Sequence, residues 1–174
     1  MYWKYIRELD AKILNTFKCT DEPIVEEYLI NEALKNDLEL YTTTRVLIDD
    51  QSNIIGYYSM YNDIVTVGGD KKRKFDIQHW TSINSFPSVR LHYLGVSDEF
   101  RKQGYGKKIL KEVLKQTKAI VEMSGCMFIT AEAINDNAFK FNEKYGFKKF
   151  RNIKGKRIAS EPELMLLKLN SLIG

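Results

Sequence analysis

The chain has few of the residues that stabilise small secreted or metal-bound proteins. Only two cysteines and two histidines occur in 174 residues. Cys19 and Cys126 lie far apart, and neither belongs to a CxxC or Cys/His metal spacing. A disulfide framework is therefore not indicated and no metal is expected, so we predict that both cysteines are reduced, unpaired packing residues.

Long hydrophobic runs are also missing. No apolar stretch approaches the roughly 18 residues that a membrane-spanning helix needs. The N-terminal segment 1–12 lacks the apolar centre of a secretory signal peptide. We therefore expect a cytoplasmic protein with no membrane partner.

Charge of one sign is present only in mild excess. The net charge is +4 and the pI is about 8.9. This balance suits an anionic ligand, but it falls short of the clustered charge typical of a dedicated nucleic-acid binder. The densest basic run, Lys71–Lys74, follows two glycines and is predicted to be an exposed loop.

The composition that remains is that of an ordinary globular protein. Hydrophobic residues make up 44% and charged residues 29%, and no repeat divides the chain, so we predict one domain over residues 1–174. Strands flank helices along the chain, which favours an α/β or α+β fold with a mixed sheet. Residue patterns predict helices over 24–36, 107–123 and 135–147, strands over 44–50, 53–61, 89–96, 126–133, 163–169 and from 148, and a loop with at most one short element over 63–88.

The clearest pattern is a strand followed by a glycine-containing turn and a helix. The turn Arg101–Gly106 reads RKQGYG and precedes the longest predicted helix. The first amides of a helix lack intrahelical partners, and the helix dipole adds partial positive charge there, so anions bind readily. Gly104 and Gly106 allow backbone angles and a close approach that side chains would prevent. The turn is therefore a candidate pyrophosphate site.

Two further observations bear on this turn. Four cations crowd the same helix start, where the dipole disfavours each by roughly 0.3–1 kcal/mol, and a bound polyanion would offset that cost. An ordinary glycine loop in a lysine-rich sequence would give the same pattern. Other phosphate-binding loops fit less well, because no Gly-x4-Gly-Lys-Ser/Thr motif is present and Ile109 stands where a dinucleotide-binding turn needs its third glycine.

These residues resemble the hallmark of the GNAT N-acetyltransferases, Arg/Gln-x-x-Gly-x-Gly/Ala between a strand and a helix. Arg101, Gly104 and Gly106 match it. Segment 135–150 is similar to the family's Asn-x-x-Ala helix ending in Gly-Phe, and the resemblance covers about residues 22–169. It implies a single GNAT-like domain with a mixed, mostly antiparallel central sheet flanked by helices and splayed between its two central parallel strands. It also implies acetyl-coenzyme A as the cofactor.

The resemblance assigns roles to residues by position. Main-chain groups near Leu94 and Val96 would hold the pantetheine arm and polarise the thioester carbonyl, and the amides from Gln103 to Lys107 would hold the pyrophosphate. Asn135 would lie near the cofactor arm, or would simply cap its helix. The expected cofactor-binding residues are Leu94, Val96, Arg101, Lys102, Gln103, Gly104, Tyr105, Gly106, Lys107 and Asn135.

One position departs from the family pattern. Many relatives have a tyrosine after Ala-x-x-Phe that is proposed to protonate the departing thiolate, whereas this chain has Asn142, whose amide cannot act as an acid. Tyr145 lies one helical turn further on, so it could reach the same side or simply pack, and solvent could supply the proton instead. Glu132 is the leading candidate for a base, with His92 as an alternative, and both could instead be structural. The expected catalytic residues are Glu132, Asn142 and Tyr145.

The implied reaction is acetyl transfer to a primary amine by direct attack in a ternary complex, without a covalent enzyme intermediate. The acceptor would be an amine on a small molecule or a protein. Segments 17–33, 53–60 and 87–96 look similar to a bacterial subgroup that includes tRNA-acetylating toxins, so an aminoacyl-tRNA acceptor is an alternative. A non-catalytic acyl-CoA-binding module is another alternative, because Asn142 replaces the acidic tyrosine.

The acceptor side is less well defined by the sequence. Tyr57, Tyr58, Tyr61 and Trp80 could line an acceptor pocket, or they could be core aromatics. No charge pattern among them identifies the acceptor. A homodimer is compatible with the sequence, which contains no signal that fixes the oligomeric state.

Overall fold

The computed structural model describes residues 1–150 and 162–169. The chain folds into two compact units. The first unit comprises Met1–Tyr61 and Leu91–Gln116, and the second comprises Asn62–Arg90 and Thr117–Gly174. That the two units belong to one domain stays a prediction. Among the described residues, no helix is both long enough and apolar enough to cross a membrane.

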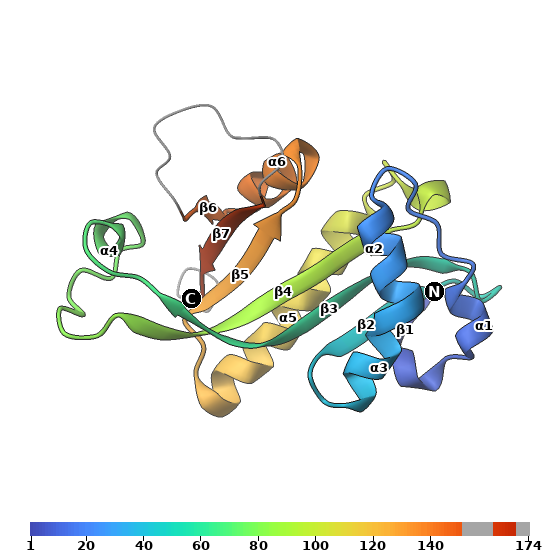
Figure 1. Ribbon diagram of the computed structural model, residues 1–174, viewed down its shortest axis with the longest axis horizontal. Helices are drawn as coiled ribbons and strands as arrows, with labels where there is room; N and C mark the ends of the chain where they lie inside the picture. The colour runs from blue at the N-terminus through green and yellow to red at the C-terminus, as the bar shows by residue number, and fades with distance from the viewer. Residues whose placement is uncertain (151–161, 170–174) are drawn as a thin grey trace. The chain divides into compact units, whose positions relative to one another are not determined.

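Seven strands and six α-helices make up the described part of the chain (Figure 1). The strands are β1 (Tyr2–Tyr5), β2 (Thr43–Ile48), β3 (Ile54–Thr66), β4 (Ser85–Val96), β5 (Phe128–Ala133), β6 (Lys148–Lys149) and β7 (Glu163–Lys168). The helices are α1 (Ala11–Leu14), α2 (Pro23–Glu27), α3 (Ala33–Leu38), α4 (Lys71–Lys74), α5 (Tyr105–Ser124) and α6 (Asp136–Lys144).

The strands form one sheet in the order β1-β2-β3-β4-β5-β7-β6. β4 and β5 run parallel and are connected through α5, as a crossover between parallel strands requires. The pairs β1–β2, β2–β3, β5–β7 and β6–β7 are antiparallel. The predicted fold, a mixed and mostly antiparallel sheet with flanking helices, is therefore confirmed.

The predicted early helix is present in the first unit, with an irregular middle. A π-helical turn, Tyr28–Glu32, joins α2 to α3 and makes one helical segment of the three. The buried carboxylate of Asp37 accepts a hydrogen bond from the Thr44 amide at 2.8 Å and pairs with Arg7 at 2.9 Å. This carboxylate connects α3 to β2 and to the segment after β1. β1 and α1 were not predicted from the sequence, because elements of four residues show little periodicity.

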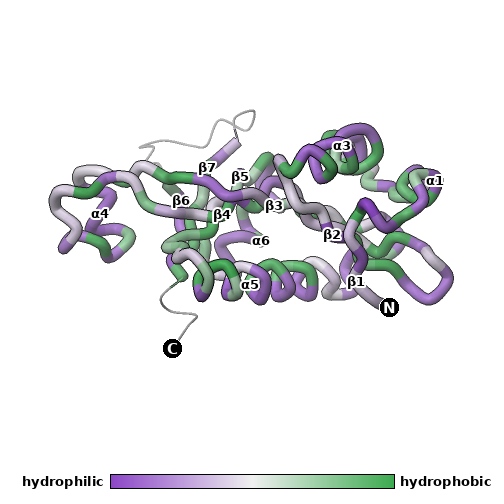
Figure 2. Tube along the Cα trace, turned by 90° about the horizontal axis from the view of Figure 1, so that it is seen from below, coloured by the Kyte–Doolittle hydropathy of each residue, from purple (hydrophilic) through white to green (hydrophobic). Residues whose placement is uncertain are grey.

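Helix α5 follows its predicted bounds closely. Ile109, Leu110 and Val113 are buried, whereas Lys111 and Lys115 are exposed. Apolar and polar residues accordingly alternate along this helix (Figure 2). The helix thus covers apolar residues with one face and leaves its lysine-rich face in solvent, as its 3.6-residue period predicts.

Two glycines of the first unit allow β3, β4 and their covering helices to pack closely. A Cβ atom at Gly56 would overlap the carbonyl oxygen of Gly95 and would lie 2.7 Å from the Ile109 side chain. A Cβ atom at Gly95 would lie 2.7 Å from Val25 and 2.8 Å from Tyr57. Only glycine therefore fits at positions 56 and 95. This close packing fixes the end of β4.

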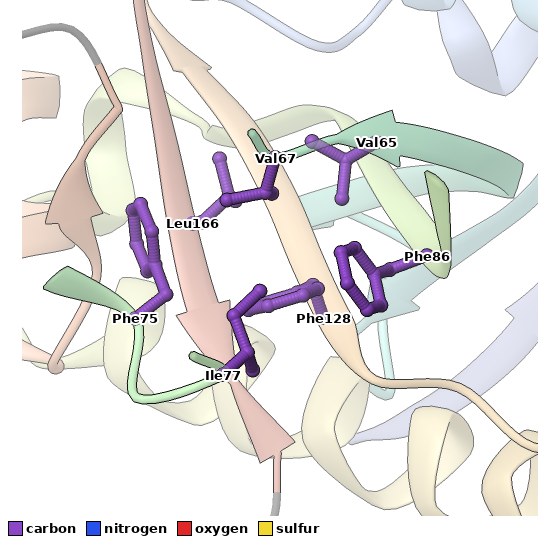
Figure 3. Close-up of a cluster of buried hydrophobic side chains, with 7 residues drawn as sticks. All are labelled: Val65, Val67, Phe75, Ile77, Phe86, Phe128 and Leu166. Carbon is purple, nitrogen blue, oxygen red and sulfur yellow. The ribbon is translucent and has the colours of Figure 1, made fainter. Parts of the chain in front are cut away.

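The second unit is built around a compact apolar cluster, which Figure 3 shows with the side chains pointing toward one another. Phe128 lies at its centre, with Phe75 at 5.9 Å and Phe86 at 6.1 Å between ring centroids, both edge-on. The other members are Val65, Val67, Ile77 and Leu166. The cluster packs the segment around α4 against β5 and β7.

The prediction of an irregular segment over residues 63–88 was wrong at both ends. β3 continues to Thr66 and β4 begins at Ser85 rather than at residue 89. Val65 and Phe86, which extend the two strands, are both buried in the cluster of the second unit. Tertiary burial therefore extends strands whose own sequence contains turn-forming glycines and polar residues.

The basic run is also not an exposed loop. Lys71–Lys74 form α4, and Lys72 is buried. Its ammonium group donates hydrogen bonds to the carbonyl oxygens of Trp80 and, at 3.2 Å, Thr81. A buried ammonium group needs such acceptors, because removing it from water without them is costly.

We predict that Gly56→Ala lowers the free energy of unfolding by about 1–3 kcal/mol, since the added methyl group overpacks the β3–β4 contact. Gly68→Ala is the matched control, because the nearest atom to its new Cβ lies 3.9 Å away. The control should change the free energy of unfolding by no more than about 0.5 kcal/mol. Chemical denaturation measures both values, and equal losses would contradict the crowding at Gly56.

Candidate functional site

The predicted turn lies at the start of α5 in the first unit, and the preceding chain is fixed by backbone hydrogen bonds. After β4 ends at Val96, the amide of Ser97 donates to Ile55 at 3.0 Å and the amide of Asp98 donates to Lys18 at 2.9 Å. A short 3₁₀ turn, Asp98–Phe100, leads into residues 101–104. The turn therefore follows a chain segment that is held on both sides.

The backbone of the turn has the conformation expected of an anion-binding loop. Lys102 and Gly104 have left-handed backbone angles, with φ of 59° and 84°. Alternation of left-handed residues with ordinary ones points successive amides toward one side and makes a concave site for anions. A Cβ atom at Gly104 would meet nothing within 4 Å. The glycine is therefore required by its backbone angle and leaves the surface in front of the turn open.

The amides of this turn find no acceptor among the residues that the structure describes. Within the described part of the chain, no group accepts a hydrogen bond of normal geometry from the amides of residues 102–107. The first backbone bond of α5 runs from the Lys108 amide to the Gly104 carbonyl, at 3.2 Å. A series of N–H groups thus precedes the first bonded turn of a 20-residue helix, which is the arrangement that attracts phosphate.

Arg101, the first residue of the motif, has protein partners in this structure. Its guanidinium group donates to the Val96 carbonyl at 3.4 Å and to the Cys19 sulfur at 3.0 Å. It also pairs with Asp98 at 3.2 Å and with Asp21. Arg101 therefore connects the end of β4, the N-terminal segment and the turn, and these contacts stabilise the turn.

The groups around Arg101 form a small charge network. Burial raises the pKa of the Cys19 thiol, although Arg101 opposes this, so the sulfur stays protonated at neutral pH. A hydrogen bond from the Thr20 amide at 3.1 Å lowers the pKa of Asp98. Cys19 and Cys126 are both buried and unpaired by disulfides, as predicted. Sequence spacing gave no signal for the roles of Cys19 and Asp21, since both lie about 80 residues before the turn.

The end of β4 carries Leu94 and Val96, which are half-buried. Gly95 between them faces the interior and packs against Val25, Tyr57 and Phe17. The two flanking main-chain positions are therefore set by close packing behind them. The structure brings these positions and the turn together in the first unit.

The other predicted site residues lie in the second unit. Asn135 caps α6, with its side chain accepting a hydrogen bond from the Ala138 amide at 2.8 Å. That Asn135 also lies near the cofactor arm stays a prediction. Glu132 is exposed near the end of β5 and pairs with Arg90 at 2.5 Å.

Asn142 lies in α6, and Tyr145 directly follows the last residue of this helix, Lys144. Asn142 is buried, with its backbone carbonyl accepting hydrogen bonds from the amides of Tyr145 and Phe147 at 3.1 Å. Tyr145 is half-buried, and its ring contacts Phe141 edge-on at 4.9 Å. Gly146 follows with φ of 89° and ends the helix, as predicted.

The aromatic residues proposed for the acceptor side separate into two groups. Tyr57 and Tyr58 are fully buried in the first unit, so the core alternative is confirmed for them. Tyr61 is partly exposed and contacts His92, which in turn lies 5.1 Å from Tyr28 between ring centroids. Trp80, in the second unit, is 39% exposed.

Comparison with known proteins agrees with this geometry. The family model described as "Acetyltransferase (GNAT) family" matches residues 3–147. A bacterial toxin structure aligns with a TM-score of 0.82 at 18% identity, covering 99% of this chain and 93% of that one. AtaT complexed with acetyl-methionyl-tRNAfMet aligns at 0.80 and 16% identity, covering 99% and 96%. AtaTR bound with AcCoA aligns at 0.75 and 17% identity, covering 98% and 94%.

Identities this low show a shared fold, whereas the family match extends over most of the chain. The match includes the whole turn from Arg101 to Gly106 and the helix that carries Asn142. The chain therefore belongs to the GNAT acetyltransferase family, as an N-acetyltransferase whose cofactor is acetyl-coenzyme A.

Proposed function

We propose that this protein transfers the acetyl group of acetyl-coenzyme A to a primary amine by direct attack. The observation that carries the proposal is the series of amides at residues 102–107, which have no acceptor in the described part of the chain and lie in a turn with left-handed residues at the start of α5. These amides would hold the pyrophosphate, with the side chains of Lys102 and Lys107 adding positive charge nearby. Arg101 would act indirectly, by keeping the turn in this shape.

The chemistry requires few protein groups once the cofactor is bound. The amine nitrogen attacks the thioester carbonyl carbon, the carbon–sulfur bond breaks and the coenzyme leaves as a thiolate. The amine must arrive neutral, so a base removes its proton before or during attack, and Glu132 is our candidate for that role. Main-chain groups at Leu94 and Val96 would polarise the carbonyl, because their positions are fixed by the packing of Gly95.

A second acceptor class has specific support. Two of the solved structures with the same fold are a bacterial toxin and AtaT complexed with acetyl-methionyl-tRNAfMet. Aminoacyl-tRNA carries a primary amine on a polyanion, which suits a chain with a net charge of +4. We therefore keep aminoacyl-tRNA beside small-molecule and protein amines as a candidate acceptor.

The transfer itself is measured as thiol release from acetyl-coenzyme A across small amines, lysine peptides and aminoacyl-tRNA. We expect release with at least one acceptor class and a matching gain of acetyl on that acceptor. Acetylation of aminoacyl-tRNA alone, with growth arrest on expression, would select the second acceptor class. Cofactor binding without turnover on any acceptor would contradict the proposal and favour a non-catalytic acyl-CoA-binding module.

We predict that Gly104→Leu abolishes the rise in melting temperature that coenzyme A produces, because the side chain enters the concave turn and disfavours the φ of 84°. Gly125→Leu is the control. Its glycine has φ of 77°, also has nothing within 4 Å and lies after α5 rather than before it. Thermal unfolding with and without coenzyme A compares the two, and a retained shift in Gly104→Leu would overturn the site assignment.

We propose Tyr145 as the acid that protonates the thiolate, since the Asn142 amide cannot. Tyr145→Phe keeps the ring contact with Phe141 and removes only the hydroxyl, so kcat should fall about 100-fold with little change in melting temperature. Tyr41→Phe, at an exposed tyrosine of the first unit, is the control and should leave kcat unchanged. An unchanged kcat in Tyr145→Phe would mean that solvent supplies the proton.

A further inference from the structure

A short segment of the first unit, residues 18–21, is bonded on one side to helix α2 and on the other to the chain that leads into the cofactor turn, Arg101–Gly106. The segment is neither helix nor strand. Each of its four residues nevertheless forms a hydrogen bond or an ion pair with a residue outside the segment. Its position is therefore set by these partners and not by a regular backbone, and the acetyl-transfer proposal gives it no role.

The contacts with the chain before the cofactor turn run in both directions. The Asp98 amide donates a hydrogen bond to the Lys18 carbonyl at 2.9 Å, and the Thr20 amide donates to the Asp98 carboxylate at 3.1 Å. The segment also supplies two of the four groups that contact the Arg101 guanidinium group. A displacement of residues 18–21 would therefore displace Asp98 and Arg101, which lie immediately before the amides of the turn.

One side chain of α2, Glu26, contacts the segment with both of its carboxylate oxygens. One oxygen accepts a hydrogen bond from the Cys19 amide at 2.8 Å, and the other pairs with the Lys18 ammonium group at 3.0 Å. Both bonds lower the pKa of Glu26, the amide bond most, so the carboxylate is charged at neutral pH. Hydrogen bonds to a charged acceptor are shorter and stronger than those between neutral groups. Glu26 thus connects α2 to the start of the segment.

The two bonds of Glu26 differ in what they contribute. The Lys18 side chain is 58% exposed, and an ion pair at such a position contributes little, because solvent screens it. Cys19, in contrast, is buried in a segment whose backbone has no helix or strand pairing. A buried amide needs an acceptor, since leaving it without one is costly. The hydrogen bond from the Cys19 amide is therefore the one that fixes the segment.

Helix α2 is itself fixed against the sheet of the first unit. The carbonyl of Val25, the residue before Glu26, accepts a hydrogen bond from the buried Tyr57 hydroxyl at 2.6 Å. The Val25 side chain packs on Gly95, where a Cβ atom would lie 2.7 Å from it. Glu26 therefore extends from a helix whose position is set by β3 and β4, and it can hold the segment in one place.

We propose that Glu26 is a positioning residue for coenzyme A. By accepting the Cys19 amide it fixes residues 18–21, and this segment keeps Asp98 and Arg101 where the amides of the cofactor turn can receive the pyrophosphate. The inference rests on the proposed assignment of the pyrophosphate to that turn. Because Glu26 acts on the pyrophosphate end of the cofactor, its loss should weaken the binding of coenzyme A without slowing acetyl transfer from bound donor.

The test measures the Kd of coenzyme A by isothermal titration calorimetry with the full chain. Glu26→Ala should raise Kd about tenfold, as expected when a hydrogen bond to a charged acceptor is lost. The KM for acetyl-coenzyme A should rise with it, while kcat stays within about twofold. Glu27→Ala, which removes the same charge from the next, exposed residue of α2, is the control and should leave Kd within about twofold. Melting temperatures show that each variant is folded.

Two further variants separate positioning from a general loss of stability. Glu26→Gln keeps an oxygen that can accept the Cys19 amide, so its Kd should stay within about twofold of the unmodified chain. Asp98→Ala releases the same segment on its other side. Glu26→Ala combined with Asp98→Ala should therefore raise Kd by clearly less than the product of the two single effects, because both substitutions act on one segment.

An unchanged Kd in Glu26→Ala would overturn the proposal, as would an equal loss in Glu27→Ala or in Glu26→Gln. Independent, multiplying effects of Glu26→Ala and Asp98→Ala would also overturn it, as would a fall in kcat at unchanged KM. The calorimetric comparison needs no acceptor. A tenfold weaker Kd in a protein that acetylates no amine would therefore support this inference and contradict only the proposed reaction.

Discussion

The contact between the Arg101 guanidinium group and its four acceptors is the interaction on which the cofactor turn depends. It draws Val96 at the end of β4, Cys19 in the N-terminal segment, and Asp21 and Asp98 toward one side chain. The amides that follow these groups have no acceptor within residues 1–150 and 162–169. The motif suggests that the positive charge of Arg101 binds the ligand, but in this structure it interacts with protein groups that shape the loop.

Close packing fixes the strand that leads into this turn. Gly56 and Gly95 have no side chains because β3, α5 and α2 approach the β4 backbone too closely for a Cβ atom. Packing of this density transmits small shifts, since a well-packed interior has no space to absorb them. The main-chain positions at Leu94 and Val96 are therefore fixed by packing residues behind the strand, which we do not expect to contact the cofactor.

The second unit manages its charges differently. Lys72 is buried against backbone carbonyls, Glu163 is buried beside Lys149, and the remaining lysines of α4 and β6 stay near the surface. The apolar cluster around Phe128 makes this arrangement possible, because it fixes α4 against β5 and β7. The two carbonyl acceptors of Lys72 offset the cost of removing its ammonium group from water.

The sequence alone determined the strand, turn and helix around Gly104 and the hairpin of β2 and β3, and its resemblance to the GNAT enzymes indicated the family. The local elements follow from periodicity and from residues such as glycine that only particular backbone angles require. Only the tertiary structure decided that β3 reaches Thr66, that Lys72 is buried, and that Arg101 is paired with Cys19, Asp21 and Asp98. Each of these features depends on residues that are distant in the sequence. A local sequence pattern therefore cannot predict the burial or the charge pairing that they produce.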